Sequence, residues 1–170
     1  GSEMCIRDRD KAMSTQLYDV LDVVGRRFQE VFSQLFGGGT AQIVLTDPDN
    51  ILTGGIDFYI QPPGKKRQQL TLLSGGERAL TVIALLFSFL DYRPAPFCVL
   101  DEVDAALDEA NVERFSSYLN RVNKETQFIV VSHRKKTMEA AEVLQGVTMV
   151  ERGVSRLLTV AFEDVKEDLA

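Results

Sequence analysis

The sequence has few of the residues that build disulfide frameworks and no segment suited to crossing a membrane. Its 170 residues contain no tryptophan, one histidine and only two cysteines, Cys5 and Cys98, so a disulfide-based scaffold is excluded. The longest apolar run, residues 82–90, is interrupted by Ser88 and is far shorter than the roughly 18–20 residues of a membrane span. Acidic residues outnumber basic ones, 25 to 19, for a net charge of −6. A broad basic surface for nucleic acid is therefore not expected.

A second absence concerns phosphate binding. The sequence contains no G-x-x-x-x-G-K-[ST] loop, the segment whose backbone N–H groups and lysine hold the phosphates of a nucleotide. The nearest match, at Gly64 and Lys65, has Tyr59 where the first glycine should be and Lys66 where Ser or Thr is needed. A hydrophobic content of 45% is nevertheless enough to bury the core of one domain or of one large lobe.

Apolar periodicity predicts a mixed α/β fold with a mainly parallel sheet. Steps of three and four from Met13 to Leu35 indicate one long amphipathic helix that ends at the glycines 37–39. Continuous apolar strands that alternate with helices are typical of a parallel sheet covered on both faces. The expected elements after the long helix are an antiparallel strand pair (41–45 and 56–60), a loop (62–67), helices at 77–90, 111–123 and 135–144, and strands at 97–100, 127–131, 147–150 and 157–162.

We divide the chain into three parts on this basis. Residues 1–10 are set aside as an added or disordered N-terminus, because they lack the apolar core of a signal peptide. Residues 11–36 form the long helix, and residues 37–170 form the α/β lobe.

Two segments carry the chemistry of a nucleotide site. Ser74, Gly75 and Gly76 open a predicted helix, where a hydroxyl, bare N–H groups and the positive end of the helix dipole can contact a phosphate. Asp101 and Glu102 end a predicted buried strand. In nucleotide sites, carboxylates at such a position bind magnesium and activate water. Each segment also has an ordinary interpretation, since Ser74 could simply cap the helix and the two acids could simply end the strand.

The same two interpretations apply to Asp108 and His133. Asp108 could cap the helix that follows it, and a single histidine after a strand, here behind Ser132, is usually structural. The order of the segments favours function: a serine-glycine helix start, an acidic strand, an Ala-Leu-Asp loop, a helix, a strand and then Ser-His. That order is the one that an ATPase architecture requires.

Residues 70–154 closely resemble the C-terminal half of the ATPase head of bacterial-type SMC (structural maintenance of chromosomes) proteins. The resemblance rests on the runs at residues 61–66, 73–80, 99–112 and 128–134, and residues 32–39 and 45–48 also fit it. ABC transporters usually have Asp-Glu-Pro-Thr at the acidic strand, whereas this chain has Val103 and Asp104 after Glu102. The resemblance implies an ABC-ATPase-like head lobe joined to the root of a coiled-coil arm. Related DNA-repair ATPases remain an alternative.

The resemblance implies a role for each site residue. Asp101 resembles the Walker B aspartate that holds Mg²⁺ through water, and Glu102 resembles the general base. His133 resembles the switch histidine that senses the γ-phosphate of ATP. The remaining nucleotide-binding residues resemble the signature loop and the D-loop, and they are Ser74, Gly75, Gly76 and Asp108.

Partners and location are implied in the same way. The resemblance implies an N-terminal lobe that carries the missing phosphate loop, a second SMC head joined through ATP, a kleisin subunit with a winged-helix domain, and non-specific DNA. It also implies a cytoplasmic protein at the nucleoid, acting in chromosome condensation and segregation. Alone, the chain is expected to be inactive and to act at most as a kleisin-binding module. The loop residues Lys65, Lys66 and Arg67 are either a solvated turn or a DNA contact.

Overall fold

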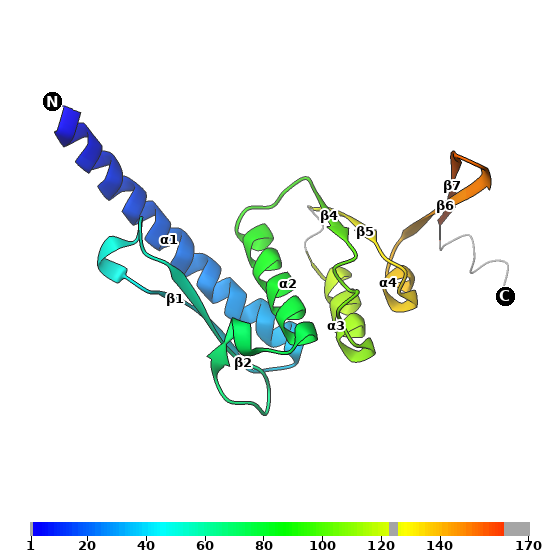
Figure 1. Cartoon of the computed structure of the whole chain (residues 1–170), viewed down its shortest axis with the longest axis horizontal. Helices are drawn as coiled ribbons and strands as arrows, with labels where there is room; N and C mark the ends of the chain where they lie inside the picture. The colour runs from blue at the N-terminus through cyan, green and yellow to red at the C-terminus, as the bar shows by residue number, and fades with distance from the viewer. Residues whose placement is uncertain (1, 123–125, 162–170) are drawn as a thin grey trace.

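The computed structural model of the chain describes residues 2–122 and 126–161 (Figure 1). A long helix lies at one end, an α/β body in the middle and a two-stranded hairpin at the other end. The mixed α/β class is confirmed, with antiparallel strand pairs and a parallel pair. No helix among the described residues has the length and apolarity needed to cross a membrane.

Helix α1 (Ser2–Phe36) contributes only its C-terminal half to the core. Val24, Phe28, Phe32 and Leu35 are completely buried, whereas Met13 is 54% exposed. The helix also includes residues 2–10, which were expected to be an added or disordered N-terminus. No proline or glycine occurs between Ser2 and Met13 to stop the helix there. Figure 1 shows this N-terminal half extending away from the body.

Three glycines turn the chain from α1 into the first sheet. Gly39 has a φ of +84°, and a Cβ added there would lie 2.3 Å from the carbonyl oxygen of Gln61. Gln29 on α1 fastens the same turn, since its side-chain amide donates to Gly39 O and accepts from Ala41 N. The end of the helix is therefore held tightly against the start of the sheet.

The first sheet is antiparallel and has the order β1-β2-β3. Strand β1 (Thr40–Leu45) pairs with β2 (Ile56–Gln61) from Thr40↔Gln61 to Leu45↔Ile56, which confirms the predicted pair. A short 3₁₀ helix, η1 (Pro48–Asn50), lies in the connection. Strand β3 (Gln68–Gln69) adds a third strand that the apolar pattern could not predict, because both of its residues are polar.

The body of the lobe packs two helices against a parallel strand pair. A 3₁₀ turn, η2 (Leu70–Leu72), leads into α2 (Gly75–Tyr92), then β4 (Phe97–Asp101), α3 (Glu109–Leu119) and β5 (Gln127–Val131). Strands β4 and β5 are parallel, in register from Phe97↔Gln127 to Asp101↔Val131. Aromatic side chains join the helices and β5, with Phe87 of α2 packed against Phe115, Tyr118 and Phe128.

The parallel pair is covered on one face only, which differs from the expectation of helices on both faces. Residues 98, 100, 128 and 130 face the core. The alternate residues form an apolar face that is about half exposed: Phe97 (58%), Val99 (55%), Ile129 (46%) and Val131 (51%). We call these four residues the open face. In the same way α2 is not buried all round, because Val82 and Phe89 are also exposed.

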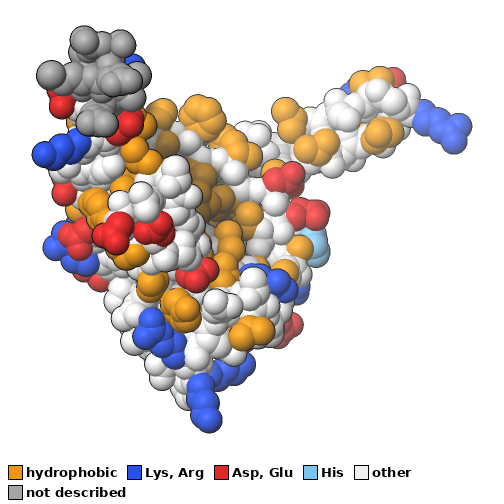
Figure 2. Space-filling view, turned by 60° about the vertical axis from the view of Figure 1, so that its left-hand side comes forward, with side chains coloured by type: hydrophobic (Ala, Val, Ile, Leu, Met, Phe, Trp, Pro, Cys, Tyr) orange, Lys and Arg blue, Asp and Glu red, His pale blue; other side chains and the backbone are white. Residues whose placement is uncertain are grey.

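The C-terminal elements differ from prediction in length. Helix α4 (Lys135–Glu139) is one short piece rather than a helix to residue 144, because Val143 already belongs to strand β6 (Val143–Glu151). Strand β7 (Val154–Ala161) pairs antiparallel with β6, so both predicted C-terminal strands are present and begin earlier than expected; residue 162, where the second was predicted to end, lies outside the described residues. Figure 2 shows this hairpin projecting from the body with hydrophobic side chains on its surface.

Candidate functional site

The N-terminus of α2 is built by a capping box. Ser74 is the N-cap, its Oγ accepts from the backbone N–H of Glu77, and the Glu77 carboxylate accepts from the backbone N–H of Ser74 at 3.3 Å. The Ser74 hydroxyl also donates to Glu77 Oε2 at 2.8 Å. Ser74 therefore does cap the helix, as its ordinary interpretation predicted. The Ser74 side chain is exposed at the helix N-terminus, but its hydroxyl is already bonded to the Glu77 carboxylate.

Gly75 and Gly76 differ in their surroundings. A Cβ on Gly75 would meet no other atom within 4 Å, whereas a Cβ on Gly76 would lie 3.1 Å from the carbonyl oxygen of Ala106. Gly76 thus brings the start of α2 against the loop that follows β4, and Gly75 leaves the outer surface of that junction open.

Asp101 and Glu102 stand at the carboxyl end of β4 with exposed side chains. Glu102 has a φ of +48°, a conformation that residues other than glycine seldom adopt, and it is the one such residue among those described. Its N–H donates to Val131 O at 2.9 Å and its carbonyl accepts from Ala105 N at 3.0 Å. Strained backbone held by such bonds is often found at functional sites.

Asp108 and His133 lie on the two neighbouring loops. Asp108 is the N-cap of α3 and accepts from Asn111 N at 2.8 Å, so its expected capping role is also present. His133 follows β5, and its side chain is exposed. Figure 2 shows this single histidine beside acidic side chains at the edge of the molecule.

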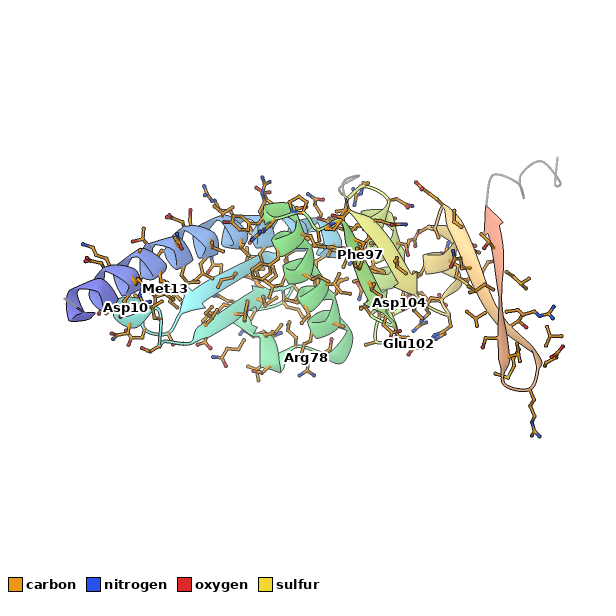
Figure 3. All side chains as sticks on the ribbon, turned by 90° about the horizontal axis from the view of Figure 1, so that it is seen from above. Asp10, Met13, Arg78, Phe97, Glu102 and Asp104 are labelled. Carbon is orange, nitrogen blue, oxygen red and sulfur yellow. The ribbon has the colours of Figure 1, made fainter. Side chains whose placement is uncertain are left out.

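The predicted site residues fall into two groups. Ser74, Gly76 and Asp108 line one groove of about 530 Å³ between the N-termini of α2 and α3, together with Lys65 and Arg114. Asp101, Glu102 and His133 do not line this groove and lie at the carboxyl ends of β4 and β5. Figure 3 shows Arg78, near the start of α2, and Glu102 on the same side of the molecule.

Two of the three basic side chains at residues 65–67 make contacts within the chain. Lys65 Nζ lies 2.8 Å from Glu77 Oε1. The Arg67 guanidinium lies over the ring of Tyr59, 4.7 Å from its centroid. Lys66 is exposed, and the described residues offer it no ion-pair partner. Burial raises the pKa of Glu77, but hydrogen bonds from Lys65 and Ser74 outweigh this effect and hold that pKa below its usual value.

A set of contacts behind His133 was not predicted from the sequence. Asp104 is completely buried and accepts hydrogen bonds from Ser132 and Thr137, and Arg134 donates to carbonyl oxygens of the loop after β4. The available signal was a third acidic residue close behind Asp101 and Glu102, although a pattern of charges cannot show which of them is buried.

The donor set at the strand ends suits a hard cation only in part. Carboxylates such as Asp101 are the ligands that Mg²⁺ prefers. However, the described residues contain no group of three or more His, Cys, Asp or Glu side chains that could hold a metal ion. Magnesium commonly takes one or two carboxylates together with substrate phosphates and water, so the residues fit an ion that arrives with a nucleotide.

These features define the class of the protein: an α/β lobe of the kind found in SMC heads, with its acidic strand and its serine-glycine helix on one side of the body. The chain belongs to the family described as the RecF/RecN/SMC N terminal domain, whose model matches residues 8–156.

Relatives with similar sequences are SMC proteins. The chain is 57% identical over 162 residues to the chromosome partition protein Smc of Bacillus subtilis (strain 168), covering 95% of this chain and 14% of that protein. It is 53% identical over 166 residues to the Smc protein of Desulfitobacterium hafniense (strain Y51), covering 98% and 14%. The chain therefore spans about one seventh of the length of these relatives.

Solved structures agree with the fold. The Smc head domain with an extended coiled coil from Pyrococcus furiosus, bound to the C-terminal domain of ScpA, has a TM-score of 0.86 at 34% identity over 98% of this chain and 42% of that one. A chain from work on ATP-driven dimerization and DNA-stimulated activation of SMC ATPases has a TM-score of 0.81 at 35% identity, covering 92% and 94%. The SMC head domain from Thermotoga maritima has a TM-score of 0.67 at 42% identity, covering 88% and 51%.

Proposed function

We propose that this chain is the C-terminal lobe of an SMC ATPase head and that it contributes half of a composite ATP site. The observation that carries the proposal is the open face of the β4–β5 pair. Four large apolar side chains on a parallel sheet are left about half exposed, although parallel sheets are normally covered on both faces. The open face requires a partner, and the sequence lacks the phosphate loop that such a partner would supply.

The family model refers to an N-terminal domain, whereas our assignment to the C-terminal half rests on the motifs. The chain carries the signature-like segment, the acidic strand and the histidine, in that order, and the phosphate loop does not precede them. The absent loop and the open face point to the same missing lobe.

The two groups of site residues support a site shared between heads. Ser74, Gly76 and Asp108 line the groove, and Gly75 is the first residue of α2 beside it; there α2 would present N–H groups to the γ-phosphate of ATP held by a second head. Asp101, Glu102 and His133 would act on ATP held by their own head. Splitting the parts in this way makes hydrolysis depend on dimerisation, because phosphoryl transfer depends on positioning and charge neutralisation.

Each residue of the second group has a definite task. Glu102 accepts a proton from the attacking water, and its side chain is exposed at the end of β4. Asp101 would help to hold the magnesium ion that arrives with ATP, and His133 would contact the γ-phosphate. The ATP-bound magnesium ion supplies charge neutralisation at the phosphates when it is present.

The partners follow from the same assignment. ATP joins two heads, and the N-terminal half of α1 is the root of a coiled-coil arm. A kleisin winged-helix domain, of the kind that ScpA supplies to the Pyrococcus furiosus head, would dock on the hairpin β6–β7 and nearby helix surface. In the cell, we place the head at the nucleoid, where ATP-driven engagement and DNA contact serve chromosome condensation and segregation.

Mixing the chain with a separately made N-terminal lobe tests the proposal. The chain alone should neither hydrolyse ATP nor bind it at micromolar concentration in calorimetry, and the mixture should hydrolyse it. Val99→Lys should abolish association and hydrolysis, since it places a charge on the open face. Its circular dichroism spectrum should be unchanged, because Val99 is already half exposed.

The matched control is Leu52→Lys, an exposed apolar residue in the turn after η1, which should associate normally. Micromolar ATP affinity of the chain alone, or normal association of the Val99→Lys variant, would overturn the assignment.

A further inference from the structure

A buried carboxylate joins the loop after β4 to the loop that carries His133. Asp104 is 0% exposed. Its Oδ2 accepts from Ser132 Oγ at 2.6 Å and from Thr137 Oγ1 at 2.5 Å. Asp104 lies two residues after Glu102, and the two hydroxyls stand on either side of His133 in the sequence. Figure 3 shows Asp104 and Glu102 close together at the end of β4.

Arg134 ties the same two loops together from the other side. Its guanidinium donates to Ala105 O at 3.2 Å and to Leu107 O at 3.1 Å. Its backbone N–H donates to Ser132 Oγ at 3.0 Å, so the hydroxyl that binds Asp104 also shapes the turn at His133. Both chain neighbours of His133 are thus anchored to residues 104–107, while the imidazole itself is exposed.

The arrangement is not the one that stability alone would favour. A buried carboxylate costs free energy unless its oxygens are hydrogen-bonded. Asp104 Oδ1 has no hydrogen-bond partner among the described residues, and neither does Arg134 Nε. Short hydrogen bonds from hydroxyls to a carboxylate are strong and directional. Asp104 therefore fixes the positions of the Ser132 and Thr137 hydroxyls, at the free-energy cost of removing its carboxylate from water.

We propose that Asp104 is a positioning residue for His133: through Ser132 and Thr137 it holds the histidine loop in register with the backbone of Glu102. The significance for ATP hydrolysis rests on the proposed function, whereas the linkage between the two loops rests on the contacts alone. Movement of either loop must then be transmitted to the other, so that the general base and the γ-phosphate contact are placed together.

The single histidine of the chain allows a direct test. With ¹³C-labelled histidine, the whole chain gives one imidazole Cε1–H resonance, that of His133. Thr137→Val keeps the shape and removes one donor to Asp104, and Thr137→Ser keeps the hydroxyl. We expect the resonance to shift or broaden in Thr137→Val and to return to within one line width of wild type in Thr137→Ser.

Two further variants make the result decisive. Asp104→Asn keeps the size of the side chain and should also move the His133 resonance. Ser88→Ala is the control, because Ser88 is equally buried but its hydroxyl bonds only Ala84 O within α2; it should leave the resonance unchanged. If a folded Thr137→Val or Asp104→Asn chain gives the wild-type resonance, the linkage is wrong. Only one of the two variants needs to fold for the test to be made.

Activity of the reconstituted head gives the second readout. Thr137→Val should lower kcat by about tenfold with less than a twofold change in the KM for ATP, since a misplaced group affects the chemical step more than binding. Thr137→Ser should restore it. Equal kcat in Thr137→Val and wild type would overturn the proposed role of the linkage in ATP hydrolysis. A wild-type head without ATPase activity would contradict the proposed function and leave the His133 resonance to decide on the linkage.

Discussion

The ammonium group of Lys65 lies 2.8 Å from the carboxylate of Glu77, and this contact joins the basic loop at residues 65–67 to the first turn of α2. Glu77 also completes the capping box with Ser74. One carboxylate therefore holds both the helix N-terminus and the basic loop, and a lysine expected in the sequence to be solvated or to contact DNA has an intramolecular partner.

Stability should depend on pH through this carboxylate. The pKa of Glu77 lies below its ordinary value of 4.5, so its contribution is complete above pH 4.5 and is lost as the pH falls through the lowered value. Glu77→Gln should remove about 0.5 kcal/mol of stability at pH 6 and progressively less as the pH falls through the lowered pKa. Urea unfolding over this pH range measures the difference. Glu30→Gln, from an exposed pair on α1, is the control, and equal pH dependence in wild type and Glu77→Gln would contradict the prediction.

Replacing Glu102 by glutamine should trap the engaged state. The substitution keeps the side-chain shape and removes the base, so ATP hydrolysis by the reconstituted head should fall by about 10²-fold or more. Heads should then accumulate as ATP-bound dimers in light scattering. Glu109→Gln, in the first turn of α3, should turn over normally. Heads of Glu102→Gln that stay monomeric with ATP, or that keep the wild-type rate, would show that Glu102 only ends the strand.

Two substitutions at Ser74 separate its structural and functional roles. Ser74→Ala removes the cap and should cost about 1 kcal/mol in unfolding free energy, while the open groove still permits dimerisation. Ser74→Arg loses the same cap and also places bulk and charge in the groove, so ATP-driven dimerisation should be lost. Unfolding by urea and dimerisation by light scattering distinguish the two effects. A Ser74→Arg head that dimerises like Ser74→Ala would remove this groove from the head–head contact.

DNA binding should depend on Lys66 more than on its neighbours. Lys65 pairs with Glu77 and Arg67 lies over Tyr59, which makes Lys66 the exposed cation of the loop best placed to reach a phosphate. In an engaged, reconstituted head, Lys66→Gln should make the negative slope of log affinity against log salt shallower by about one unit. ATP-driven dimerisation should be unaffected.

The control for this measurement is Lys135→Gln, an exposed lysine on α4 whose side chain is 85% exposed. If Lys66→Gln has the wild-type slope, residues 65–67 form an ordinary surface loop.

Much of this fold follows from local sequence patterns. Strand β5 has the predicted bounds 127–131, and the pair β1–β2 lies where alternating apolar residues and glycines indicated. The order of signature segment, acidic strand and histidine also led to the family. These features are determined locally, because side-chain periodicity and turn residues act over a few neighbouring positions.

Tertiary structure decided the rest. Helix α4 ends at Glu139 and the chain enters strand β6, which pairs with β7, at Val143; pairing between strands can override helix propensity. Burial of Asp104, the bond from Lys65 to Glu77 and the open face of β4–β5 each depend on segments far apart in the chain. The sequence by itself determined which chemical groups the lobe carries. Only the packing of distant segments decided which of them are buried, paired or left for a partner, because burial and hydrogen bonding depend on neighbours in space.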